Sequence, residues 1–320
     1  MEECIFCKGH ERQPVFRIRT HSFPWELKSC VSCKAYLLSP LPTKKQLESA
    51  YCMQYYGQGK TKFNPLIEFV VNTFRRIRAS RVIKGIPRDG KVLDIGCGSG
   101  AFLNYLHEKY NFGLFGLEIK GDIAERAIER NKGFKLYVGF FNEIDFKNQT
   151  FDVITMYHVF EHLLTPYEDI QKIKKILKPG GKLIISMPNI DSWQATMFKD
   201  KWFHLDVPRH LIFFTPNDFK RIMKFEKFLL NNERYISWEQ NPFSYIQSCL
   251  NGLSSKHNLL YEFLKTNKKN KYSRSDLFEI GLHMLFTAIT LPLFLIIDVL
   301  ESVFNKSATV EYTFTYLPND

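Results

Sequence analysis

The chain has 320 residues, and its 45% hydrophobic content argues for a folded protein with a sizeable core. Its formal charge of +11 favours an anionic partner such as phosphate, nucleic acid or lipid headgroups, although a solvated lysine-rich surface would give the same excess. The N-terminal segment is charged from its second residue and has no apolar stretch, so we expect no secretory signal and a cytoplasmic protein.

Two cysteine pairs lie near the N-terminus and are separated by 22 residues: Cys4-x-x-Cys7 and Cys30-x-x-Cys33. Paired cysteines in a chain without an export signal favour metal binding over disulfides. Four thiolates complete a closed tetrahedral Zn²⁺ site, which has no open position and therefore folds a small module rather than catalysing a reaction. The remaining cysteines are predicted to be packing residues: Cys52, Cys97 and Cys249.

The next elements are a proline-marked connector (39–57) with a short helix, and an amphipathic helix within 64–86. From residue 90 onward the pattern alternates. Strands are predicted at 91–98, 113–119, 134–140, 151–157 and 182–189, with helices at 100–110, 121–133 and 166–181. A loop from 191 leads to a helix that begins at Thr215 and Pro216, and strands follow at 227–237 and 308–316. This order predicts an α/β protein with a doubly wound, Rossmann-like sheet.

The segment "KVLDIGCGSGAFL" is a strand, a glycine-rich turn and a helix start. Gly96, Gly98 and Gly100 let the backbone turn sharply and approach a ligand. On its own the turn also satisfies the dinucleotide-binding fingerprint of nicotinamide dehydrogenases. However, Asp94 lies just before the glycines, where an acidic side chain can bind a cation rather than a pyrophosphate. Glu118 ends the next strand, where its carboxylate can accept hydrogen bonds from both ribose hydroxyls.

With "FDVITMYHVFEHL" and "LKPGG" following in order, residues 65–225 resemble the class I S-adenosylmethionine-dependent methyltransferases. The resemblance implies a seven-stranded sheet whose last strand returns antiparallel. Many members carry an Asp after the third strand that binds adenine, and here Phe140, Phe141 or Asn142 replaces it. The predicted cofactor-binding residues are Asp94, Gly96, Gly98, Gly100, Glu118, Phe140, Phe141, Met156 and Tyr157.

Ligands in such folds bind at the carboxyl ends of the strands, and histidines gather there in the sequence. His158 is predicted to be the base that deprotonates the acceptor, with His210 as the second choice. Glu161 and His162 are added as catalytic candidates, although Glu161 could simply orient a histidine or cap a helix. The His158-x-x-Glu161-His162 spacing also resembles, with its first ligand changed, the metal-binding patch of some quinone and RNA methyltransferases. His204 is predicted to be a surface or packing histidine.

The segment around the predicted fourth strand, "FDVITMYHVFEHL", lacks the Asn/Asp-Pro-Pro-aromatic motif of amino methyltransferases. Its absence favours an O- or C-methyltransferase. Zinc ribbons resembling this one precede methyltransferase domains that act on nucleotide-linked deoxysugars. The resemblance implies a sugar of a nucleotide- or lipid-linked glycan intermediate as acceptor. The alternatives are an apolar acceptor such as a quinone or polyketide, and, third, RNA, which the lack of interleaved aromatic and basic residues disfavours.

Residues 280–297 are 18 consecutive positions without Asp, Glu, Lys or Arg. Because they lie between the predicted sixth and seventh strands of one sheet, a simple transmembrane anchor is disfavoured. Two interpretations of 277–304 remain: a helix–kink–helix, broken near Pro292, that dips into one membrane leaflet and returns, or a helix buried against the domain or against a second subunit. In the first, headgroups would meet Lys268, Lys269, Lys271 and Arg274. The predicted domains are 1–57 (zinc ribbon and connector), 58–239 plus 307–320 (methyltransferase) and 240–306 (helical insertion).

Overall fold

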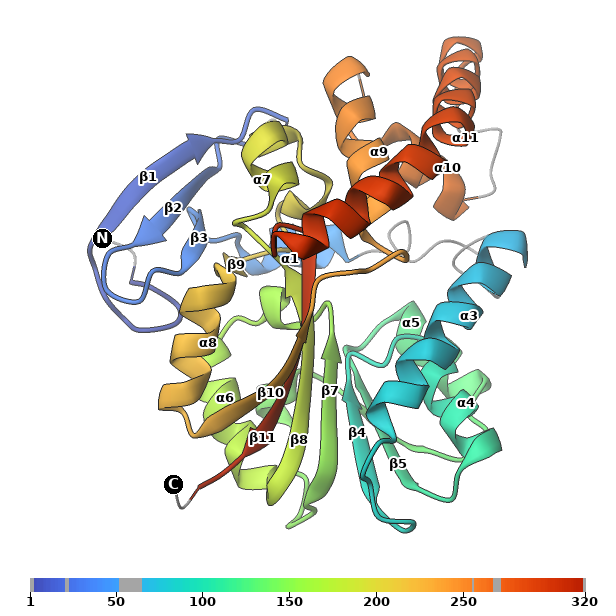
Figure 1. Cartoon of the computed structure of the whole chain (residues 1–320). Helices are drawn as coiled ribbons and strands as arrows, with labels where there is room; N and C mark the ends of the chain where they lie inside the picture. The colour runs from blue at the N-terminus through green and yellow to red at the C-terminus, as the bar shows by residue number, and fades with distance from the viewer. Residues whose placement is uncertain (1–2, 21–22, 52–64, 255, 267–271, 319–320) are drawn as a thin grey trace.

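The computed structural model describes residues 3–20, 23–51, 65–254, 256–266 and 272–318, which form two sheets flanked by helices (Figure 1). The larger sheet has the strand order β10-β11-β8-β7-β4-β5-β6. Its strands are β4 (Lys91–Ile95), β5 (Gly113–Glu118), β6 (Lys135–Val138), β7 (Phe151–Tyr157), β8 (Leu177–Pro188), β10 (Phe228–Arg234) and β11 (Thr309–Tyr316). The helices around it are α3 (Pro65–Val82), α4 (Ala101–Lys109), α5 (Asp122–Glu129), α6 (Pro166–Ile176) and α8 (Pro216–Phe225).

This sheet confirms the predicted doubly wound α/β architecture. The strands β8, β7, β4, β5 and β6 are parallel, and β11 lies antiparallel between β8 and β10. One boundary differs from the prediction: α6 ends at Ile176, and the segment 177–181 belongs to β8 instead of the helix. The reason is a tertiary interaction, because Leu177 pairs with Phe151 and the Lys178 ammonium binds both oxygens of Asp152 at 2.8 Å.

A second, four-stranded sheet was not predicted. It has the order β1-β2-β3-β9, from β1 (Arg12–Arg17), β2 (Glu26–Cys30), β3 (Tyr36–Ser39) and β9 (Ile212–Phe213). Three strands come from the cysteine-rich segment, and the fourth comes from the region expected to be a plain loop. That region also forms α7 (Trp193–Phe198), η3 (Lys199–Lys201) and η4 (Phe203–Leu205). The N-terminal module therefore shares a sheet and a hydrophobic core with the larger domain, where Phe6 packs against Phe214 at 5.4 Å.

The connector contains the expected short helix, α1 (Lys44–Ala50). Its N-terminus is fixed by a capping box in which Thr43 and Gln46 exchange side-chain and backbone hydrogen bonds. The prediction for Cys52 and the proposed boundary between 57 and 58 lie outside the described residues.

Three helices fill the segment between β10 and β11: α9 (Asn241–Leu253), α10 (Leu259–Thr266) and α11 (Arg274–Val303). α11 is one helix of 30 residues that contains Pro292 and bends along its length (Figure 1). Proline has no N–H for the carbonyl of Ala288, which explains a bend without a break. The interpretation as a helical hairpin is therefore wrong, because α11 is a single helix: the chain leaves the sheet through α9 and α10 and returns to it along α11.

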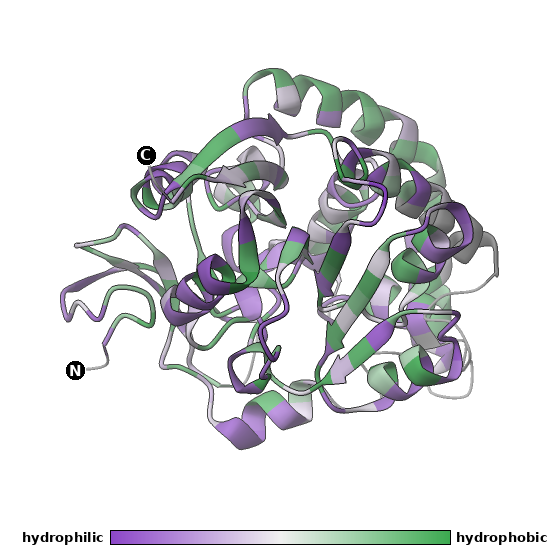
Figure 2. Ribbon diagram, turned by 90° about the horizontal axis from the view of Figure 1, so that it is seen from below, coloured by the Kyte–Doolittle hydropathy of each residue, from purple (hydrophilic) through white to green (hydrophobic). Residues whose placement is uncertain are grey.

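The interpretation of α11 as a helix buried against its own domain is also wrong for most of its length. Only 17% of its most apolar 18-residue window is buried, and by length and composition the helix could cross a membrane. Hydrophobic residues follow one another along this peripheral helix (Figure 2). Its most exposed apolar side chains include Phe278, Leu285, Ile289, Ile296 and Val303, each more than half exposed.

Both ends of this helical segment are fastened to the same edge of the sheet. The Asn241 side-chain oxygen accepts a hydrogen bond from the Thr309 backbone at 3.0 Å, and its amide donates to Asp298 at 2.7 Å. Thr309 pairs with Pro188, the last residue of β8. The segment therefore leaves and returns where the parallel strands end.

Candidate active site

The glycine-rich turn after β4 is shaped by close packing. Gly96, Gly98 and Gly100 all have positive φ, which favours glycine at each position. A Cβ atom on Gly96 would lie 2.4 Å from a Val159 methyl group, so a larger residue would push the turn away from the end of β7. Gly100 is the N-cap of α4 and offers no side-chain cap to the first backbone N–H groups of that helix, which an anionic ligand could therefore satisfy.

Two buried carboxylates flank this turn, as the sequence predicted. Asp94 accepts a hydrogen bond from the Thr155 hydroxyl at 2.6 Å. Glu118 accepts from the backbone N–H groups of Gly98 at 2.7 Å and Ile119 at 2.9 Å. Burial raises the pKa of Asp94 to about 6 and that of Glu118 to about 7, because a desolvated carboxylate resists ionisation. A ligand with a hydroxyl group or a positive charge would therefore stabilise the ionised form of either carboxylate.

The other predicted cofactor contacts differ in accessibility. Phe140 is about half exposed, whereas Phe141 is buried against Phe146. Met156 is fully buried in the sheet core, and the ring of Tyr157 lies under the Arg78 guanidinium at 4.0 Å. Phe140 therefore has the most accessible of the three aromatic rings among these residues, and the cofactor contacts themselves stay predictions.

His158, the predicted base, directly follows β7. Its φ of 55° is unusual for a residue other than glycine and is held by a hydrogen bond from its backbone N–H to Ser186. Its Nδ1 lies 3.2 Å from Glu161 Oε1, and its side chain is 22% exposed. The turn thus holds one imidazole between a buried carboxylate and a cavity.

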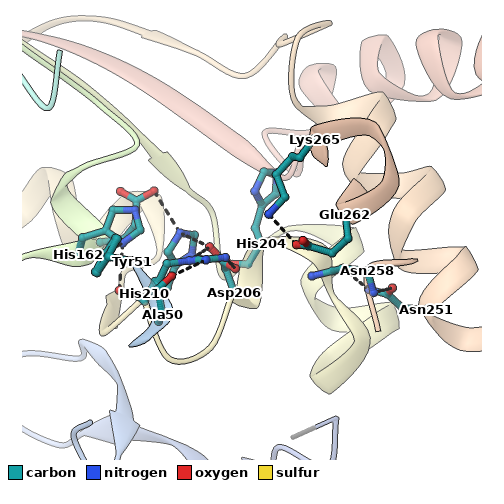
Figure 3. Close-up of polar contacts among 12 residues, drawn as sticks. Ala50, Tyr51, His162, His204, Asp206, His210, Asn251, Asn258, Glu262 and Lys265 are labelled. Atoms are coloured by element: carbon teal, nitrogen blue, oxygen red, sulfur yellow. Dashed lines mark hydrogen bonds and ion pairs between the residues drawn. The ribbon is translucent and has the colours of Figure 1, made fainter. Parts of the chain in front are cut away.

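Glu161 is completely buried beneath these histidines. Burial opposes its ionisation, but the hydrogen bond from His158 and the positive potential of the neighbouring histidines lower its pKa to about 2. His162 shows the opposite effect: burial and repulsion from His210 lower its pKa to about 4, which keeps the imidazole neutral. The two rings meet edge to face with centroids 4.6 Å apart (Figure 3).

Residues that the sequence analysis missed hold this cluster in place. The Tyr51 hydroxyl lies 3.0 Å from His162 Nδ1, and Arg209 bridges Asp206 to the carbonyl of Ala50 (Figure 3). His204 is buried and stacks parallel to His158 at 6.0 Å, so it is a packing histidine rather than a surface one. No local pattern marks Tyr51, because its contact spans 111 residues of sequence.

A cavity of about 340 Å³ opens beside His158, between α3, the sheet and the segment that follows β10. Its lining includes His158, Tyr157, Ser186, Arg78, Trp238 and Glu311. Arg78 is paired with Glu239 at 2.8 Å, and Arg81 with Glu311 at 2.5 Å. The cavity therefore offers an aromatic ring, hydroxyl groups and compensated charges next to the predicted base.

The four N-terminal cysteines lie together as predicted. Cys4 and Cys33 sulfurs are 3.6 Å apart, Cys7 and Cys30 sulfurs are 3.5 Å apart, and all four lie within 4.8 Å. Sulfurs on one tetrahedral Zn²⁺ are about 3.8 Å apart, given Zn–S bonds of about 2.3 Å. The two turns are also alike: Lys8 and Lys34, each after the second cysteine, both have positive φ near 60°. The arrangement fits zinc.

Comparison with known proteins agrees with this geometry. Residues 71–227 match the model of a family described as a methyltransferase domain. This region is an S-adenosylmethionine-dependent methyltransferase domain. The chain is 27% identical to the ubiquinone biosynthesis O-methyltransferase of Idiomarina loihiensis over 41% of its length and 58% of the relative. It is 35% identical to the phosphoethanolamine N-methyltransferase of Plasmodium falciparum over 32% of its length and 40% of the relative.

Solved structures show the same fold. A Galdieria sulphuraria protein proposed to be a sarcosine dimethylglycine methyltransferase superposes with a TM-score of 0.50, at 15% identity, over 80% of this chain and 91% of the other. The chain spans about half the length of the curated relatives it matches.

The Glu118→Gln variant tests whether the buried carboxylate of Glu118, a predicted cofactor-binding residue, destabilises the fold when it is ionised. The raised pKa means that the folded state holds the proton more tightly than the unfolded state between pH 4.5 and about 7. Stability therefore falls as pH rises through this window, by about 3 kcal/mol in full. We expect the variant without ligand to melt above wild type at pH 8 and close to it at pH 5, while binding S-adenosylmethionine about tenfold to a hundredfold more weakly. The exposed Glu125→Gln is the control, and a lower melting temperature at pH 8 would contradict the assignment.

Proposed function

We infer that the protein transfers a methyl group from S-adenosylmethionine to an oxygen or carbon nucleophile. The observation that carries this proposal is the placement of His158: it joins the turn beside the cofactor cradle to a cavity, with a buried carboxylate behind it. The bound cofactor supplies an electrophilic methyl group. The protein's own contribution is to position the acceptor and to take up its proton.

The hydrogen bond to Glu161 decides which nitrogen of His158 can act. A carboxylate is only an acceptor when ionised, so His158 Nδ1 carries a proton, and in the neutral ring Nε2 keeps its lone pair. Nε2 can then accept a proton from the acceptor as the methyl group is transferred. Glu161, with its pKa lowered to about 2, stabilises the imidazolium that forms, without itself taking the proton.

We propose a sugar of a nucleotide- or lipid-linked glycan intermediate as the acceptor. Support comes from the cavity, whose Trp238 ring and polar lining suit the apolar face and hydroxyls of a sugar, and from the cysteine module packed beside the catalytic edge. An apolar small molecule is the second candidate, supported by the similarity to a ubiquinone O-methyltransferase.

The four cysteines are proposed to bind one structural Zn²⁺, and the exposed α11 to lie on the cytoplasmic face of a membrane. Support for the second proposal is the run of exposed apolar side chains and the return of the chain to one edge of the sheet, which favours a surface-bound helix over an anchor. Of the basic residues expected to contact headgroups, Arg274 is the first residue of α11, and the three lysines (Lys268, Lys269 and Lys271) lie outside the described residues.

His158→Asn tests the base. Asn tolerates the left-handed backbone at this position better than Ala, so loss of activity would not reflect strain. We expect turnover to fall by at least a hundredfold, with S-adenosylmethionine affinity within about threefold of wild type by calorimetry. Turnover close to wild type would exclude His158 as the base.

Cys4→Ser tests the zinc site. Metal analysis should show a loss of about one equivalent of zinc, together with a lower melting temperature, because metal binding contributes directly to folding such modules. Cys249→Ser, which removes a thiol outside the cluster, should keep the zinc. Equal zinc contents in both variants would rule out the four-cysteine site.

The triple variant Phe278→Ser, Ile289→Ser and Ile296→Ser tests the membrane contact. Burying such side chains is worth about 1.5–3 kcal/mol each, so the variant should sediment with vesicles containing anionic lipid at least tenfold less than wild type. Changing an equal number of exposed apolar residues elsewhere (Ile128, Phe225 and Leu229) to Ser should leave sedimentation unchanged. A wild-type protein that stays in the supernatant at low salt would refute the proposal.

A further inference from the structure

We propose that Glu161, His162 and His210 bind a divalent transition-metal ion behind the predicted base, in addition to the zinc of the four cysteines. Each of the three residues offers one ligand atom, and these atoms lie within 4.8 Å of one another. Ligands about 2.1 Å from a common ion lie about 3–3.5 Å apart, so the most distant pair would need to close by up to about 1.3–1.8 Å.

The hydrogen bonds of the two imidazoles leave the correct nitrogens for a metal. His162 Nδ1 lies 3.0 Å from the carbonyl oxygen of Arg209, and His210 Nδ1 lies 2.7 Å from that of His204. A carbonyl can only accept a hydrogen bond, so both Nδ1 atoms carry protons, and in the neutral rings both Nε2 atoms then keep their lone pairs. Metal-binding histidines are oriented by such a bond from the nitrogen that does not coordinate.

The carboxylate of Glu161 is also incompletely satisfied. It is fully buried, Oε1 takes the hydrogen bond from His158, and Oε2 has no hydrogen-bond partner within the described part of the chain. A buried anionic oxygen without a partner is costly, and a cation between it and two imidazoles would compensate it.

A protonated His210 is the competing explanation, because it faces Glu161 at 3.9 Å and Asp206 at 3.6 Å. Neither distance is a hydrogen bond, and Asp206 is already paired with the guanidinium of Arg209. An imidazolium in this place would therefore hold Glu161 only loosely, whereas a metal would bond to it directly.

Two imidazoles and one carboxylate suit Zn²⁺, Mn²⁺, Fe²⁺ or Co²⁺ rather than the all-oxygen sites of Mg²⁺ and Ca²⁺. The ion would join η2 (Phe160–His162) to the segment 204–210 that closes over it. Glu161 would then be fixed from both sides. The metal would thus be a positioning element for His158, which hydrogen-bonds the same carboxylate.

Co²⁺ titration of the full-length protein with its ribbon zinc in place tests the site by absorption spectroscopy and calorimetry. We expect one equivalent of Co²⁺ with visible d–d bands but without the intense thiolate charge-transfer band that cobalt on cysteines gives. Glu161→Gln and His210→Ala should each weaken this binding at least tenfold. His204→Gln is the matched control, because its side chain is not a ligand and its carbonyl, which orients His210, is retained.

Three results would overturn the proposal: no Co²⁺ bound beyond the ribbon, binding that the two ligand variants leave unchanged, or binding lost equally in the control. If His210→Ala does not fold, Glu161→Gln alone carries the test, since it is nearly isosteric and its folding is checked by circular dichroism. The readout is metal binding, so it is independent of whether the proposed methyl transfer occurs.

Discussion

The position of β11 between β8 and β10 constrains the rest of the molecule. Since β11 runs antiparallel, its first residue, Thr309, must lie beside Pro188 at the edge where the parallel strands end. The helix before it, α11, therefore ends at the catalytic edge, and Asn241 fastens the start of the helical segment to the same place. Thr309 and Glu311 also line the cavity beside His158. A surface that covers α11 would thus lie close to this cavity.

The catalytic edge concentrates three buried carboxylates, and their environments differ. Glu118 is held only by backbone N–H groups and Asp94 mainly by a hydroxyl, so burial dominates and raises the pKa of each. Glu161 is surrounded by histidines, and its pKa is lowered. A ligand with hydroxyl groups or positive charge would therefore stabilise the ionised forms of Glu118 and Asp94. The carboxylate of Glu161 is already stabilised by the surrounding histidines. This asymmetry separates a cofactor side from an acceptor side without reference to any bound molecule.

The sequence was sufficient for features that depend on local pattern. Alternating strands and helices gave the parallel sheet, the glycine spacing gave the turn after β4, and Thr215 with Pro216 marked the start of α8. The sequence was insufficient where pairing between distant segments determines the secondary structure. β9 has only two residues, and it exists because Leu37 and Tyr36 pair with it across about 175 residues of chain. The early end of α6 likewise follows from pairing with β7, and Pro292 bends α11 without breaking it, which helix propensity does not reveal.

The same long-range contacts couple the cysteine module to the catalytic end. β3 pairs with β9, which begins two residues after His210, the Tyr51 hydroxyl contacts His162, and Arg209 binds the carbonyl of Ala50. The segment 204–213 is therefore held from one side by the N-terminal module and from the other by Glu161, whose carbonyl accepts the Leu211 N–H. Folding of the cysteine module must then influence how His162 and His210 are placed. A metal that only stabilises the N-terminal sheet would in this way contribute to the geometry around His158, although its nearest atoms belong to a different sheet.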